Sequence, residues 1–138
     1  METFHFDNNI RVFCIAAESF PNGVLAAHQK LHKMLPTSEG RNFFGISYGS
    51  KDGIAYKAAV EESFPGEAEK YGCESFIIPQ GDYIGETLTD WCKDETLVAK
   101  TFQKLLSDPR LDKNGFCLEI YLNETDMRCL VKIESVKK

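Results

Sequence analysis

A single carboxylate interrupts an otherwise apolar and aromatic stretch near the C-terminus, Phe116–Asn123 (FCLEIYLN). This stretch has the composition of a β-strand, in which successive side chains point to opposite faces of a sheet. Glu119 therefore shares one face with Cys117 and Tyr121, and the opposite face is aliphatic. A carboxylate beside aromatic rings either meets water or lines a cavity in which it binds a positively charged group.

Aromatic side chains from other expected strands could lie beside Glu119. They are Tyr48, Tyr56, Tyr83, Trp91 and Tyr121. Their rings would provide stacking area and a negative face for a cation, while the carboxylate would supply charge. We therefore predict that Glu119 and these five aromatic residues bind a flat or cationic organic molecule. The residues alone leave open a second interpretation, in which the rings are ordinary strand residues and Glu119 faces solvent.

Other reactive residues give weaker patterns. His28 and His32 lie four residues apart on an expected helix, but a metal site needs a third ligand, and the remaining histidine, His5, lies in the N-terminal tail. The five cysteines are widely spaced without a CxxC pair, which favours reduced thiols. P-loop, GxGxxG and GxSxG motifs are absent from the sequence. We expect no metal, no cofactor and no catalytic residue, unless Glu119 serves as a general base.

The elements that position these residues repeat along the chain. The first half has a strand, a helix and two strands, at residues 10–17, 22–35, 42–48 and 54–61. The second half has strand runs within 74–91, a helix at 94–107 and strands at 116–122 and 127–135. Each half therefore has the order β-α-β-β, with an offset of about 73 residues that places Phe43 on Phe116 and Tyr48 on Tyr121.

Two such units favour an α+β fold. We predict duplicated β-α-β-β units that form one mainly antiparallel sheet, with two helices on one face and a ligand cleft on the other. The length fits a single domain over residues 1–138, with pseudo-repeats at about 10–65 and 74–135 and Gly66–Gly72 as the connector.

Composition excludes several classes of partner. Sixteen basic and twenty-one acidic residues give a net charge of −5. No basic run precedes the terminal Lys137–Lys138, so direct nucleic-acid binding is not expected. No stretch approaches the roughly 20 apolar residues of a membrane span, and the N-terminus lacks the features of a signal peptide. We expect a cytoplasmic protein that binds a small organic ligand and not a membrane; the sequence identifies no protein partner.

Several segments together resemble the gyrase-inhibitor-like, effector-binding domain family. They are Phe44–Tyr48, Ile54–Val60, Ile77–Trp91 (IIPQGDYIGETLTDW), Phe116–Asn123 and Met127–Ile133. The most specific element is the E-x-Y-L pattern of Glu119, Tyr121 and Leu122, and Gly81, Tyr83 and Trp91 form a second one. The resemblance covers nearly the whole chain. Such domains are the SOUL-like ligand-sensing parts of AraC-type and MerR-type bacterial transcription regulators, and they also occur alone.

The resemblance implies two related halves around an aromatic cleft, with a central Glu that attracts lipophilic cations. This chain has no helix-turn-helix segment, so direct transcription control is not expected. We predict a standalone domain that senses or sequesters a lipophilic, cationic aromatic ligand, as in multidrug binding. Two alternatives stay open. One is a hydrolase of cyclopropane-bearing or other electrophilic natural products with Glu119 as general base, and the other is a protein-interaction inhibitor of the gyrase type.

Overall fold

A computed structural model describes residues 1–20, 22–37, 40–50, 53–94, 96–112 and 115–134. The strands are β1 (Glu2–Phe6), β2 (Ile10–Ala16), β3 (Phe43–Ser50), β4 (Gly53–Glu61), β5 (Glu74–Ile78), β6 (Gly81–Leu88), β7 (Cys117–Tyr121) and β8 (Met127–Lys132). The helices are α1 (Val24–Met34), α2 (Glu67–Lys70) and α3 (Leu97–Leu106), with a short 3-10 helix, η1 (Trp91–Lys93).

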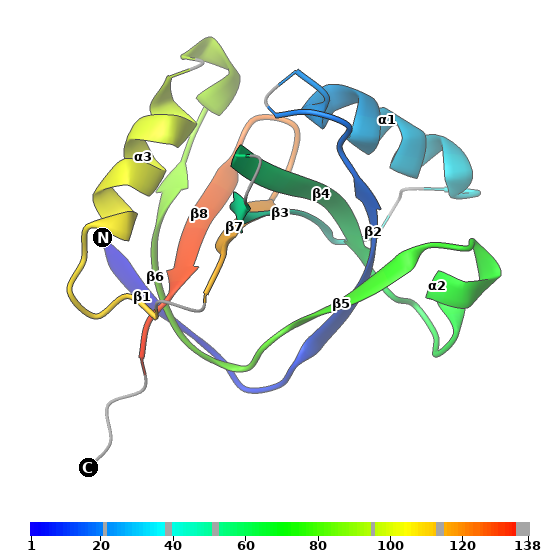
Figure 1. Cartoon of the computed structure of the whole chain (residues 1–138), viewed down its shortest axis with the longest axis horizontal. Coiled ribbons are helices and arrows are strands. Elements are labelled where there is room, and N and C mark those ends of the chain that lie inside the picture. The colour runs from blue at the N-terminus through cyan, green and yellow to red at the C-terminus, as the bar shows by residue number, and fades with distance from the viewer. Residues whose placement is uncertain (21, 38–39, 51–52, 95, 113–114, 135–138) are drawn as a thin grey trace.

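All eight strands form one antiparallel sheet that curls into a half-barrel (Figure 1). Their order is β1-β6-β8-β7-β3-β4-β2-β5, so β3 and β7 meet at the centre. The two halves of the chain occupy opposite ends of this order, except for their first strands. β1 pairs with β6 of the second half, and β5 pairs with β2 of the first half.

Both long helices cover the same face of the sheet. α1 packs through Leu31 against Phe13 of β2 and Val60 of β4. α3 packs through Leu105 in a cluster that contains Ile84 of β6 and Val131 of β8. The strand registers place these four strand residues on one side, so the predicted α+β class, antiparallel sheet and shared helix face are confirmed.

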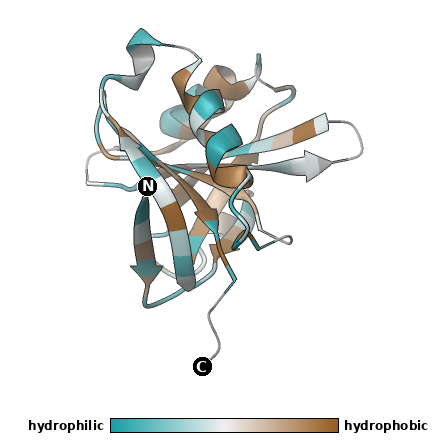
Figure 2. Ribbon diagram, turned by 90° about the vertical axis from the view of Figure 1, so that its left-hand side faces the viewer, coloured by the Kyte–Doolittle hydropathy of each residue, from teal (hydrophilic) through white to brown (hydrophobic). Residues whose placement is uncertain are grey.

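The opposite, concave face of the half-barrel carries a core of its own. Its buried members include Val12, Ile46, Ile78, Leu118 and Leu130. Figure 2 shows hydrophobic and hydrophilic residues alternating along the strands, as expected for a sheet with different surroundings on its two faces. The predicted aliphatic face of the strand that carries Glu119, now β7, therefore packs in a core through Leu118.

The cleft that contains Glu119 lies on the helix-covered face of the sheet, whereas the sequence pattern predicts Glu119 on the open face. Glu119 pairs across the sheet with Gly45 and Cys129, and Cys129 packs in the cluster beneath α3. Glu119 therefore belongs to the helix-covered face, and its cleft opens between the two helices. The prediction failed because strand alternation separates the two faces of a sheet but does not identify the one that the helices cover.

Three elements were not predicted, namely β1, α2 and η1. The N-terminal segment forms β1, so His5 is a strand residue, and its Nδ1 lies 2.6 Å from Asp82 Oδ1 of β6. The predicted connector contains α2, where buried Glu67 accepts two hydrogen bonds from Arg41, at 3.0 and 2.8 Å. Trp91 begins η1 and does not continue β6. The predicted last strand extends to Ser135, which is outside the described residues.

Candidate functional site

A cleft with a volume of about 990 Å³ lies over the centre of the sheet, between α1 and α3. Its floor is formed by Phe43, Tyr56, Glu119 and Tyr121 from β3, β4 and β7. The lining also includes His28 of α1, Val98 of α3 and Trp91 of η1. A concave, largely apolar site of this size is typical of small-molecule binding.

Glu119 is the centre of a hydrogen-bonded cluster on the floor. The hydroxyl groups of Tyr56 and Tyr121 both donate to Glu119 Oε1, each at 2.6 Å, and the two hydroxyl oxygens are 3.1 Å apart. Charge-assisted hydrogen bonds of this length hold a carboxylate in a fixed position. Both of these bonds fall on the same oxygen, so Oε2 retains its capacity to accept.

Gly45 provides the space for this cluster. A Cβ atom at this position would collide with both Glu119 Oε1 and Tyr56 Oη. Gly45 pairs directly with Glu119 on the neighbouring strand, at the central β3–β7 pairing. The absence of a side chain at this one position therefore allows a carboxylate and a phenol to meet in the middle of the sheet.

His28 extends the cluster toward α1. Its Nε2 lies 2.8 Å from the Tyr56 hydroxyl oxygen. A tyrosine hydroxyl has one proton, and that of Tyr56 is donated to Glu119. His28 must then donate from Nε2, which assigns the Nε2–H tautomer to the neutral ring.

Burial determines the charge states of these groups. It raises the pKa of Glu119 above its usual value, while the hydrogen bonds from Tyr121 and Tyr56 act in the opposite direction. It also raises the pKa of both tyrosines, which therefore remain hydrogen-bond donors. Burial, with a smaller contribution from His32, lowers the pKa of His28 to about 4. At neutral pH the imidazole is uncharged, so it adds no positive charge beside Glu119.

The walls of the cleft supply rings and apolar edges. Phe20 stacks on Tyr56 with ring centroids 6.0 Å apart, and Trp91 is tilted against Tyr121 at 6.1 Å. Three rim residues are unusually exposed for their type, namely Phe20 at 43%, Leu25 at 68% and Leu122 at 41%. The rim therefore offers apolar surface to a ligand that enters the cleft.

Four of the six predicted site residues come together here. Glu119, Tyr121, Tyr56 and Trp91 all line the cleft. Tyr83 does not, because it faces the concave core, where its hydroxyl donates to the Pro79 carbonyl at 2.7 Å. Tyr48 packs against that same core, since an even-numbered position in β3 faces away from Gly45.

The sequence reading missed His28, Phe20 and Gly45. The spacing of His28 and His32 placed both on one helix face, and both line the cleft. In the sequence, this spacing indicates two histidines on one helix face and a metal pattern without a third ligand, and neither identifies a ligand cleft. No group of three or more His, Cys, Asp or Glu residues suited to a metal occurs in the described part of the chain. None of the helices described there has the length and apolar character of a membrane span.

No protein-family model and no curated protein matches this chain. Several solved structures are similar in fold, among them the following two. An integron cassette protein from the mobile metagenome of Vibrio cholerae has a TM-score of 0.67 at 12% identity, covering 96% of this chain and 95% of that one. A hydrolase from Listeria innocua has a TM-score of 0.54 at 12% identity, covering 96% and 91%. At such low identity these similarities show the fold alone.

Replacing Gly45 with Ala should destabilise the protein by about 1–3 kcal/mol, because the added methyl group collides with the Glu119–Tyr56 hydrogen bond. Urea unfolding measures this change. Gly49→Ala is the matched control on the same strand, since a Cβ there meets no atom of the described residues within 4 Å. Equal effects of the two substitutions would contradict the role assigned to Gly45.

We predict that His28 titrates near pH 4 as the Nε2–H tautomer, which NMR of the ring resonances can measure. Its ordinary pKa is 6.5. Between these values the unfolded chain binds a proton that the folded protein does not, so this residue makes the free energy of unfolding fall as the pH is lowered.

His28→Gln should remove that contribution. Glu119 contributes with the opposite sign, because its raised pKa favours the folded state at low pH. The test is therefore the difference between wild-type and variant unfolding free energies across this pH range. A difference that does not change with pH, or a His28 titration near 6.5, would contradict the assignment.

Proposed function

We propose that this protein binds a lipophilic, cationic aromatic molecule in the cleft between α1 and α3, with Glu119 as its charge partner. The observation that supports this most is the carboxylate itself, held by two tyrosine hydroxyls on the floor of a ring-lined cleft. A carboxylate that has lost part of its hydration gains more from a cation than an exposed one does.

The charges around the cleft also favour a positively charged ligand. His28 is neutral at pH 7, and the guanidinium of Arg41 is already paired with Glu67. Glu124 adds a second carboxylate at the rim. Small inorganic cations would keep their hydration shells and gain little from the rings, whereas an aromatic cation would displace water and contact the π faces.

This proposal agrees with the resemblance to effector-binding domains, in which a central Glu lies in an aromatic cleft. The similarity in fold to solved structures does not identify a ligand. The support from this chain therefore rests on the Glu119 cluster and the aromatic lining, which are independent of those comparisons.

The proposal predicts that Glu119→Gln weakens binding of the tetraphenylphosphonium cation by about 1.5–3 kcal/mol, the free energy of a lost charge-assisted interaction. Triphenylphosphine oxide, a neutral analogue, should be affected much less. Trp91 is the single tryptophan of the chain and lines the cleft, so its fluorescence reports on both titrations.

Glu124→Gln is the matched control, because Glu124 also lines the cleft but is exposed. Its effect should stay below about 1 kcal/mol. Affinity of wild-type protein for the cation should also fall as the pH drops through the raised pKa of Glu119, and that dependence should vanish in Glu119→Gln. Equal losses for the charged and neutral compounds would show that Glu119 organises the cleft without recognising charge.

Hydrolysis is a second candidate, favoured by the hydrogen-bonded chain from His28 through Tyr56 to Glu119. In a cyclopropane-bearing substrate, Glu119 would accept a proton from water as the water oxygen bonds to a ring carbon. The strained C–C bond would break, and its electron pair would move through a conjugated carbonyl to give an enolate. Once Glu119 is protonated, one tyrosine hydroxyl could donate to the enolate oxygen, and the proton on Glu119 would then pass to the enolate carbon. One of the structures similar in fold is itself described as a hydrolase.

Turnover separates the two candidates. A hydrolase should convert many equivalents of such an electrophile, and Glu119→Gln should lower kcat by about 10²–10⁴ at saturating substrate. A binding protein should retain no more than one equivalent per site. Multiple turnovers that persist in Glu119→Gln would rule out Glu119 as the general base.

A further inference from the structure

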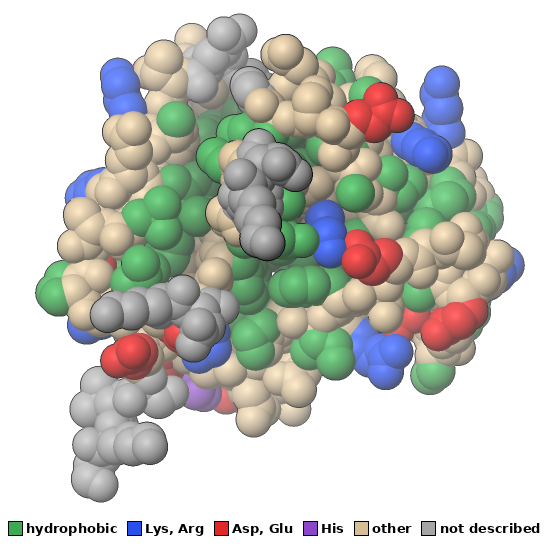
Figure 3. Space-filling view, viewed as in Figure 1, with side chains coloured by type: hydrophobic (Ala, Val, Ile, Leu, Met, Phe, Trp, Pro, Cys, Tyr) green, Lys and Arg blue, Asp and Glu red, His purple; other side chains and the backbone are tan. Residues whose placement is uncertain are grey.

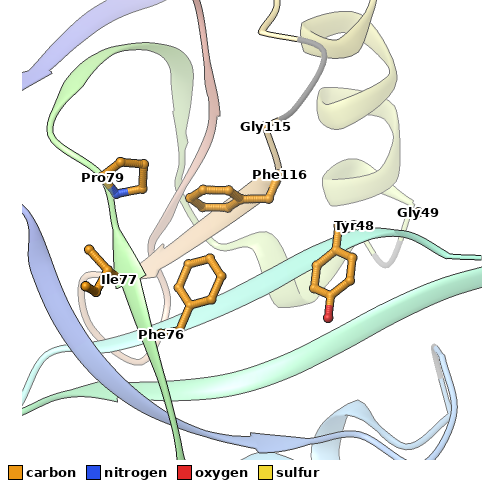
Figure 4. A pocket seen from close by; sticks show the side chains of 7 residues that line it. All are labelled: Tyr48, Gly49, Phe76, Ile77, Pro79, Gly115 and Phe116. Carbon is orange, nitrogen blue, oxygen red and sulfur yellow. The ribbon is translucent and has the colours of Figure 1, made fainter.

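A second hollow, of about 690 Å³, lies on the opposite side of the sheet from Glu119. Three aromatic rings surround it, those of Tyr48, Phe76 and Phe116, with Ile77 and Pro79 beside them (Figure 4). The rings of Phe76 and Phe116 meet edge to face with centroids 5.3 Å apart. All three rings pack against the concave core, so this hollow is separated from the cleft by the sheet.

Lys57 provides a positive charge beside one of these rings, that of Tyr48, just outside the residues that line the hollow. Its side chain is only 13% exposed, and its Nζ lies 5.6 Å from the ring centroid of Tyr48. Burial lowers the pKa of Lys57, but hydrogen bonds with Glu74 and Tyr48 outweigh this effect and raise it. The ammonium group therefore stays charged although it is largely shielded from water.

The present partner of Lys57 is a carboxylate from the edge of the sheet. Glu74 Oε1 lies 2.7 Å from Lys57 Nζ, but the Glu74 side chain is 56% exposed. Glu74 begins β5, the last strand in the sheet order. Because the Glu74 side chain reaches solvent, it can turn away from Lys57 and leave its place at Nζ to another carboxylate.

We propose that this hollow is a second binding site, for a small lipophilic carboxylate whose anionic group replaces Glu74 at Lys57 Nζ. The apolar body of the ligand would lie against Phe76 and Phe116, where ring edges and faces are both available. One ammonium group matches a single carboxylate and not a multiply charged phosphate compound. On the face shown in Figure 3, hydrophobic side chains gather around a central hollow, and a basic and an acidic side chain lie together beside it.

This site is independent of the proposed function of the cleft, because the two differ in face and in the sign of the charge they recognise. Calorimetric titration of the full chain with 2-naphthoate, and with neutral 2-naphthamide, tests it. Lys57→Met should weaken 2-naphthoate about 10- to 100-fold, the loss of a charge-assisted hydrogen bond, and leave 2-naphthamide nearly unchanged. Glu74→Gln should strengthen 2-naphthoate about two- to fivefold, because it removes the competing carboxylate.

Glu119→Gln serves as the control for location and should leave 2-naphthoate binding unchanged. Thermal unfolding followed by circular dichroism checks that each variant is folded. If Lys57→Met does not fold, the change in 2-naphthoate affinity of Glu74→Gln tests the proposed site instead. The proposal is overturned if wild-type protein does not bind 2-naphthoate at millimolar concentration, or if Lys57→Met binds it as tightly as wild type. Weaker binding in Glu74→Gln, or a loss caused by Glu119→Gln, would overturn it as well.

Discussion

Two tyrosine hydroxyls that donate to the same oxygen of Glu119 hold a carboxylate where a sheet would otherwise bury apolar side chains. The surrounding features follow from this arrangement. Gly45 leaves the required space, and His28 donates to the Tyr56 hydroxyl oxygen, so that the Tyr56 proton is directed to the carboxylate. The cleft between the two helices gives a ligand access to the cluster. A buried charge with incomplete compensation costs free energy in the absence of a partner, and such a cost is typical of a site that functions by accepting one.

Strand alternation predicted the part of the site that depends on single strands. Glu119 and Tyr121 lie two residues apart in β7 and necessarily share a face. Tyr48 lies three residues from Gly45 in β3, so it faces the concave core and not the cleft. The predicted offset, which matches Tyr48 with Tyr121, joins residues of opposite faces. Phe43 faces the helices, whereas Phe116, its predicted equivalent, packs against the concave core. A pattern comparison aligns elements within a residue or two, which is too coarse to assign faces.

Other parts of the structure depend on relations that a sequence pattern does not contain. The side of the sheet that α1 and α3 cover results from how each helix returns across its strands. His28 becomes a site residue only through that choice, because the same helix face would lie far from Glu119 if the helices covered the concave side. In β1, Phe4 and Phe6 alternate with polar residues, but this pattern is too short to distinguish a strand from a tail without its pairing to β6, a strand distant in sequence.

The exchange of first strands between the halves also affects the order in which the molecule can assemble during synthesis. β5 follows β4 closely and can join β2 as soon as it leaves the ribosome. β1 is made first, yet its partner β6 appears only after the whole first half has been translated. β1 therefore cannot pair until β6 has been synthesised, and the central pairing of β3 with β7, which carries Glu119, forms later still. Such long-range pairing slows folding, and the nascent first half must meanwhile remain soluble with its central strand edge uncovered.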